Sequence, residues 1–335
     1  MRIGLALRLV ALTAAVVGVV VLPHFLSDFR ASQFAFVGLY FIAILGLDIL
    51  TGFSGQISLG HGAFMAVGGY TTAILMAKHG VRDIATIPLA ALVAGAVGLV
   101  FGIPALRLSG LYLALATFGI AISLPSILKK FDGFTGGSTG LNLFGLKQQT
   151  GGGVGVHVLG HTFTENDWLY YLTWSIGGVL FVLAWALLSG RLGRSLRALR
   201  DSETAAASSG INLATHKIAA FGISAAYAGV AGSLLAINIA YVNPDTYPIV
   251  LSLYLLVGVA VGGLGSLWGA VLGALLIEFL QLYAGSVVSF VPLVHATSKT
   301  PGVPSVVFGA VLVILMLVLP TGVGGLVRRL ARVRS

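Results

Sequence analysis

Charge-free apolar stretches follow one another along almost the whole chain, and they restrict its fold more than any other feature of the sequence. They are residues 9–22, 31–47, 49–77, 84–106, 108–128, 168–190, 218–244, 246–277, 279–298 and 300–327. A helix needs roughly 20 apolar residues to cross the hydrocarbon of a bilayer. We therefore predict an all-α, polytopic integral membrane protein with about ten transmembrane segments, and roughly eight with re-entrant pieces fits the pattern too.

Composition supports the same fold class. Hydrophobic residues make up 57% of the 335 residues and charged residues only 9%, whereas a soluble domain carries about 25% charged residues. So little charge cannot cover a water-facing surface, and residues 1–335 are interpreted as one transmembrane domain. Some helices are expected to be discontinuous, because Gly262, Gly263 and Gly265 interrupt the long stretch 246–277. The run 9–22 has no small-x-small cleavage site and is interpreted as an uncleaved first span.

Two long loops and the basic residues suggest an orientation. If the N-terminus lies inside and about ten segments alternate, the loop 191–217 and the arginine-rich end of the chain fall in the cytoplasm. The glycine-rich loop 129–167 then falls outside, together with most acidic residues. Arginine-rich inner loops agree with the positive-inside rule, so both termini are predicted to be cytoplasmic.

The chain carries no recognisable catalytic or metal-binding set. It has no phosphate-binding loop, no zinc-binding helix and no cysteine. His157 and His161 are four residues apart, but they lie in the glycine-rich loop without a matching carboxylate. We expect no metal, no cofactor and no enzymatic activity, and the sequence favours transport. If transport is uphill, its energy must come from an ion gradient or from a partner.

The inner loop has the pattern of a docking element. Arginines at 191, 194, 197 and 200 recur every three residues, which places them along one side of a helix. Asp201 or Ser202 can cap a second, short helix of small residues, and Gly210 can end it in the left-handed conformation. The alanines at 205, 206 and 207 predict a flat surface that a partner protein can approach closely.

Four motifs in this loop and in the apolar segments resemble one family. They are RSLRALRDSETAAASSGIN at 194–212, LTGFSGQISLGHGAFMAVGGY at 50–70, TGGSTGL at 135–141 and VGGLGSLWGAVLG at 261–273. The first resembles the coupling loop of permease subunits from branched-chain amino acid ABC importers, and all four occur in the family's order. The run 106–115 makes the chain more similar to the LivM-like than to the LivH-like member of the permease pair.

The resemblance implies a multi-pass permease subunit in a bacterial cytoplasmic (inner) membrane. Its expected partners are a second, LivH-like permease, two cytoplasmic ATPase subunits that bind the ATP, and an extracytoplasmic solute-binding protein. The expected cargo is a branched-chain or related small amino acid. The coupling residues would be Glu203, Ala206 and Gly210 within the loop 191–217. One departure is Asp48, which stands where the family commonly has an uncharged asparagine.

A translocation path is expected among polar and small residues in apolar surroundings. The candidates are Asp48, Gly55, Gln56, Ser58, His61 and Glu278. Carboxylates within the membrane are costly and are functional candidates by default. Glycines can instead serve only close helix packing. Two alternative functions remain open: an ion-coupled secondary transporter of small organic solutes, for which discontinuous helices are also typical, and an ABC permease for urea or amides.

Overall fold

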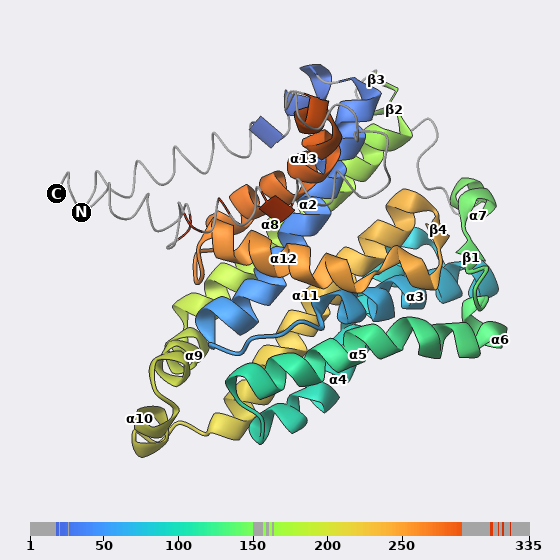
Figure 1. Ribbon diagram of the computed structural model, residues 1–335. Helices are drawn as coiled ribbons and strands as arrows, with labels where there is room; N and C mark the ends of the chain where they lie inside the picture. Colours follow the sequence, from blue (N-terminus) through green and yellow to red (C-terminus); the bar gives the residue numbers. More distant parts are fainter. Residues whose placement is uncertain are drawn as a thin grey trace, which may run out of the picture.

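The computed structural model describes residues 18–19, 21–25, 27–149, 157–158, 161–162 and 164–289, together with 309–310, 314, 317 and 322. Figure 1 shows a bundle of long helices joined by short segments. The predicted segments 9–22 and 300–327 and both chain termini fall largely or wholly outside the described residues.

Helices account for most of the described chain. The α-helices are α2 (Asp28–Asp48), α3 (His61–His79), α4 (Asp83–Gly102), α5 (Gly110–Lys130), α6 (Asp132–Thr135), α7 (Phe144–Gln149), α8 (Glu165–Ser189), α9 (Arg191–Asp201), α10 (Glu203–Ser208), α11 (Leu213–Ile239), α12 (Ile249–Gly262) and α13 (Gly269–Ser289). Three short segments are 3-10 helices, namely η1 (Leu22–Phe25), η3 (Pro104–Leu106) and η4 (Pro244–Thr246). The segment η2 (Ile49–Phe53) is a π-helix.

The strands are short and form two antiparallel pairs. β1 (Leu141–Asn142) pairs with β4 (Tyr241–Val242), with Leu141 opposite Val242. β2 (His157–Val158) pairs with β3 (His161–Thr162). His157 and His161 therefore lie on this hairpin.

Six of the described helical segments are long and apolar enough to cross a membrane: Asp28–Phe53, Asp83–Gly102, Gly110–Lys130, Glu165–Ser189, Leu213–Ile239 and Pro244–Gly262. This confirms the all-α, polytopic class. α13 contributes a shorter apolar segment, Gly269–Tyr283, and α3 packs among the long helices. The count of about ten spans stays a prediction.

Two helices form the interior of the bundle. Within the most apolar 18 residues of each segment, 89% of the residues of Asp28–Phe53 and 78% of those of α11 are buried inside the chain. The corresponding shares for α4, α5 and α8 lie between 22% and 28%, so these three helices form the periphery and turn apolar side chains outward. In a bilayer that outward surface faces lipid, which removes the need for a polar exterior.

Glycines bring α11 close to its neighbours. A Cβ added at Gly232 would lie less than 3.0 Å from the carbonyl oxygen of Met65 in α3, and one at Gly229 would overlap Ala90 and Ala94 in α4. Small residues at such crossings let helix backbones approach, which is a principal source of helix association in membranes. The glycines of the 50–70 motif take part, since Gly68 faces Gly229 in the same way.

The prediction that 49–77 forms one apolar segment separate from 31–47 is wrong. The helix α2 continues through Asp48 into η2, and the chain then leaves helical structure over residues 54–60 before α3 begins at His61. Asp48 does not end the helix, because its carboxylate accepts a hydrogen bond from Gly265 N–H at 2.8 Å. The predicted break at Gly262, Gly263 and Gly265 is confirmed: α12 ends at Gly262 and α13 begins at Gly269.

The two long loops lie at opposite ends of the bundle. In Figure 1, α9 and α10 lie at one end, and β1, α6 and α7 lie at the other. Contacts join the second group: Lys78 at the end of α3 donates to Gly133 O, and Lys129 at the end of α5 forms an ion pair with Asp245. We call the first the α9 end and the second the β1 end.

Candidate functional site

The helix α9 lies across the α9 end of the bundle with one buried face. Gly193, Leu196 and Leu199 are buried, whereas Arg191, Arg194, Arg197 and Arg200 form an exposed ridge. The ridge confirms the predicted one-sided spacing of the arginines. A Cβ on Gly193 would overlap the carbonyl of Leu188, so this glycine permits the tight turn from α8 into α9.

Arg200 joins α9 to the end of α2. Its Nη1 donates to the carbonyl oxygen of Gly52 at 2.6 Å, across 148 residues of sequence. Arg200 also passes closely over Gly55, where φ is +74° and an added Cβ would lie 2.9 Å from Arg200 Cγ. Glycine is needed at this position both for the left-handed backbone and for the approach of the arginine.

Asp48 and Gly265 complete this contact. Asp48 Oδ1 accepts from Gly265 N–H at 2.8 Å, and Gly265 has a φ of +73°. A Cβ at Gly52 would overlap both Asp48 and the Gly265 nitrogen, and one at Gly265 would lie 3.2 Å from Arg200 Nη1. We name Asp48, Gly52, Gly55, Arg200 and Gly265 the glycine junction. It joins α9, the end of α2 and the turn between α12 and α13.

The helix α10 projects beyond the junction. Ser202 caps it, because its hydroxyl accepts from Ala205 N–H at 3.3 Å, and Gly210 has a φ of +80°. Both features were predicted. Glu203 holds α10 against α11 through Lys217, whose Nζ lies 2.8 Å from Glu203 Oε2 and is buried.

The predicted alanine surface needs a correction at Ala206. This residue is only 2% exposed and packs inside the chain, whereas Thr204, Ala205, Ala207 and Ser208 are exposed. Ala206 was expected to face a partner because three small residues in a row look alike in sequence. On one helical turn, however, they cannot all face outward. The surface that α10 offers to a partner is formed by its exposed residues.

The predicted path residues separate into groups. Asp48 and Gly55 belong to the junction, and Gln56 lies beside it, where its Nε2 donates to Ser54 Oγ at 2.8 Å. Ser58 and His61 are fully buried at the start of α3, and His61 Nε2 lies 2.8 Å from Ala43 O in the middle of α2.

Glu278 lies half-buried in α13, in electrostatic range of Tyr40 on α2. Ala43, whose carbonyl oxygen contacts His61, lies three residues further along the same helix. The six candidates therefore occupy three places, namely the glycine junction, the start of α3 and α13.

Two hydroxyl residues from other helices contact the start of α3 and were not among the predicted site residues. Thr117 Oγ1 of α5 accepts from Leu59 N–H, and Ser252 Oγ of α12 accepts from Gly62 N–H, both at 2.9 Å. These hydroxyls satisfy backbone donors that a helix start leaves unpaired, and they come from other helices. The available signal was a hydroxyl residue within an apolar run, which does not by itself identify its partner.

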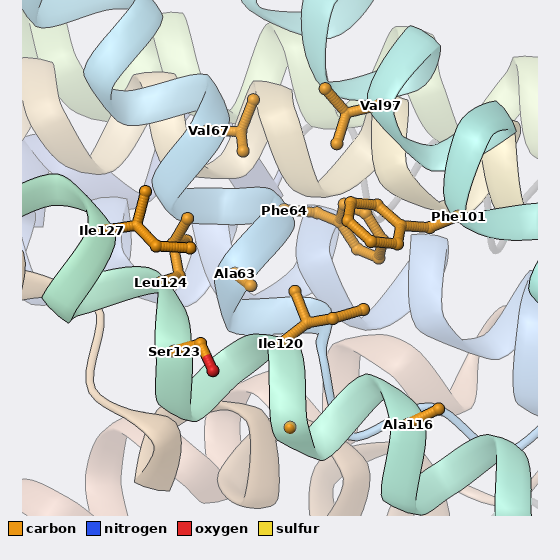
Figure 2. A pocket seen from close by; sticks show the side chains of 11 residues that line it. Ala63, Phe64, Val67, Val97, Phe101, Ala116, Ile120, Ser123, Leu124 and Ile127 are labelled. Atoms are coloured by element: carbon orange, nitrogen blue, oxygen red, sulfur yellow. The ribbon is translucent and has the colours of Figure 1, made fainter.

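An apolar cavity of about 360 Å³ lies between α3, α4 and α5. Figure 2 shows side chains of the three helices converging on it, among them Phe64, Val67, Phe101, Ile120 and Leu124. Ser123 is the one polar side chain in the lining. The volume of the cavity falls in the range of about 300–1,000 Å³ that ligand pockets span. Gly119, Ser123 and Ile127 in its lining are exposed, so the cavity opens toward the outside of the bundle.

Comparisons with known proteins agree on one family. Residues 30–318 match the family described as branched-chain amino acid transport system / permease component. The LivM high-affinity branched-chain amino acid transport system permease protein of Salmonella typhimurium (strain LT2) is 35% identical over 254 residues, which are 71% of this chain and 60% of the relative. The LivM protein of Escherichia coli (strain K12) is 34% identical over 281 residues, covering 79% of this chain and 66% of the relative.

A second type of relative is more distant. The LivH permease protein of the same Escherichia coli strain is 26% identical over 302 residues, covering 85% of this chain and 91% of the relative. No solved structure matches the chain. The chain spans 60% to 66% of the length of the two LivM relatives. The family match covers most of the chain, and the chain therefore belongs to the family of branched-chain amino acid transport system permease components.

Proposed function

We propose that this chain is a membrane-spanning permease subunit of an ATP-driven importer, with α10 as the docking helix for a cytoplasmic ATPase subunit. The observation that carries the proposal is the glycine junction. Through Arg200 and Gly52, the helix that precedes α10 is bonded directly to the end of the most buried span. A force applied to α10 from outside the membrane therefore has a short covalent and hydrogen-bonded route into the bundle.

The proposed orientation has the α9 end in the cytoplasm. Arg107 and the arginine ridge of α9 lie at this end. Asp132, Glu165, Asp167 and Asp245 lie in the segments of the β1 end. The positive-inside rule counts lysine and arginine together. Because Lys78, Lys129 and Lys130 lie at the β1 end, the proposed orientation rests on the arginine-rich loop at the α9 end and on the arginines that the sequence places near the end of the chain. The membrane would be the bacterial inner membrane, as the sources of the relatives suggest.

The proposed cargo is a branched-chain amino acid. The names of the LivM and LivH relatives support it. The apolar cavity between α3, α4 and α5 could take at most the aliphatic side chain of such a cargo, because its one serine cannot replace the water around an ammonium and a carboxylate group. The choice of a branched-chain amino acid over urea or a small amide therefore rests on the names of the relatives.

The proposed partners follow from the same assignment. Relatives named LivM and LivH suggest that this chain pairs with a second permease. The chain itself has no nucleotide-binding motif, so ATP would be bound by separate ATPase subunits, and a solute-binding protein would deliver cargo at the β1 end. Glu203 and Gly210 would then hold α10 in its docking position, and Ala206 would pack its inner face.

Ala207→Glu should weaken ATPase binding at least tenfold, or by about 1.4 kcal/mol. Ala207 is exposed on α10, and a carboxylate there would be desolvated without a partner at a close protein contact. The measurement is the amount of ATPase that co-purifies with the permease at several salt concentrations. Ser138→Glu, exposed at the β1 end, is the matched control and should retain binding. Wild-type recovery of the ATPase with both Ala205→Glu and Ala207→Glu would contradict docking on α10.

A further inference from the structure

We infer that a groove beside α9 binds an anionic glycerophospholipid. The groove has a volume of about 270 Å³ and lies between the end of α8, α9 and the turn that joins α12 to α13. The residues that carry the argument are Trp185, Leu188, Ser189, Arg197, Ser266 and Trp268. The inference requires only that the chain spans a membrane, and it does not depend on the proposed ATPase docking.

One side of the groove is aromatic and turned outward. Trp185 is 60% exposed and Trp268 is 57% exposed, while the Trp268 ring rests on Phe181 of α8 with centroids 5.0 Å apart. Further along α8, Val182 and Leu183 are exposed as well, so the groove is continuous with an apolar outer surface. Tryptophan is enriched at the level where acyl chains meet headgroups, and the last turn of a spanning helix lies at this depth.

The other side of the groove is cationic. The Arg197 guanidinium donates to the carbonyls of Leu188 at 2.5 Å and Gly193 at 3.0 Å, and it lies over the Phe53 ring at 5.8 Å. Neutral carbonyls fix the position of the guanidinium but do not neutralise its charge. Arg194 and Arg191 follow on the same ridge.

The four arginines of the ridge outnumber the acids beside them within the described part of the chain, which are Asp201 and, at the glycine junction, Asp48. Asp201 is paired with Arg200, and Glu203 is paired with Lys217. No ion pair joins Arg191, Arg194 or Arg197 to a described acidic residue. A phosphate at this position would be the missing counter-charge, since basic pockets beside spanning helices favour anionic headgroups.

The combination of the two sides selects a lipid over a free phosphate. A phosphate ion would use the arginines and leave the tryptophan surface uncovered. A phospholipid uses both, with an acyl chain along Trp185 and Trp268 and a headgroup phosphate at Arg197. The hydroxyls of Ser189 and Ser266 lie in the same lining and can donate to the headgroup.

The test is tryptophan quenching by brominated lipid in nanodiscs made from the full chain. Brominated phosphatidylglycerol and brominated phosphatidylcholine are titrated separately into nanodiscs of unlabelled phosphatidylcholine. We expect quenching to saturate at a lower fraction of the anionic lipid. The extra quenching should vanish in the double variant Trp185→Phe/Trp268→Phe, which removes the two fluorescent indoles and keeps an aromatic ring at each position. Added inorganic phosphate should not reverse it.

The arginine variants locate the site. Arg197→Gln should weaken the preference for the anionic lipid about fivefold. Because Arg197 also holds two carbonyls, the double variant Arg191→Gln/Arg194→Gln provides a second test at exposed positions, and it should weaken the preference too. Arg107→Gln removes the same charge at the same end outside the groove and should have no effect. Equal quenching by both lipids, or a preference that survives all α9 variants, would overturn the inference.

Discussion

Gly232→Leu is expected to prevent the chain from accumulating as a folded membrane protein. A Cβ at this position would lie less than 3.0 Å from the Met65 carbonyl oxygen, so a side chain cannot be accommodated without separating α11 from α3. Overpacking a well-packed core usually costs about 1–3 kcal/mol. We expect the upper end of this range or more here, because backbone atoms, which have no rotamers, form the obstacle.

The matched control for this change is Gly178→Leu. Gly178 lies on the exposed side of α8, and nothing would approach a Cβ there within 4 Å. The same substitution in a helix of similar length should therefore leave expression and thermal stability unchanged. Monodisperse yield after detergent extraction and the thermal midpoint are the measurements. If both variants behaved like the wild type, close packing of α11 on α3 could not be a determinant of the fold.

If the proposed function holds, Arg200→Gln is expected to reduce uptake at least about tenfold while the chain still accumulates and still binds the proposed ATPase subunit. The variant loses a charged hydrogen bond to Gly52 O at the glycine junction, and hydrogen bonds to charged groups contribute about 1.5–3 kcal/mol. Since α10 is untouched, docking should persist, and movement of the loop should no longer be transmitted to the end of α2. ATP hydrolysis should continue with little transport.

Arg191→Gln is the control on the same helix, because Arg191 is exposed at the start of α9 and should be dispensable for uptake. The informative quantity is the ratio of cargo transported to ATP hydrolysed, which a merely destabilised protein would not change. An unchanged ratio in Arg200→Gln would show that the glycine junction does not couple ATP hydrolysis to transport.

Local features of the candidate site were predictable from sequence. The cap at Ser202, the left-handed Gly210 and the break after Gly262 depend on neighbours a few residues away. The arginine spacing likewise predicted the exposed ridge of α9. Each of these features is a preference of the backbone or of one helical face, which a single sequence records directly.

Long-range features were not predictable. Asp48 looked like the end of one span, but its bond to Gly265, 217 residues away, allows the helix to continue. The family commonly has an asparagine at this position, and its amide oxygen could accept the same hydrogen bond. Ala206 looked like its exposed neighbours, because its burial depends on how the loop packs rather than on its own side chain.

The proposed importer function can be measured as ATP-driven uptake of labelled leucine into proteoliposomes. The vesicles contain this chain, a second permease and the ATPase subunits, and the solute-binding protein is supplied at the β1 end. We expect uptake that requires ATP at the α9 end and continues after ionophores have dissipated the ion gradients. Accumulation by this chain alone, driven by an ion gradient without ATP, would contradict the proposed importer function and would identify a secondary transporter.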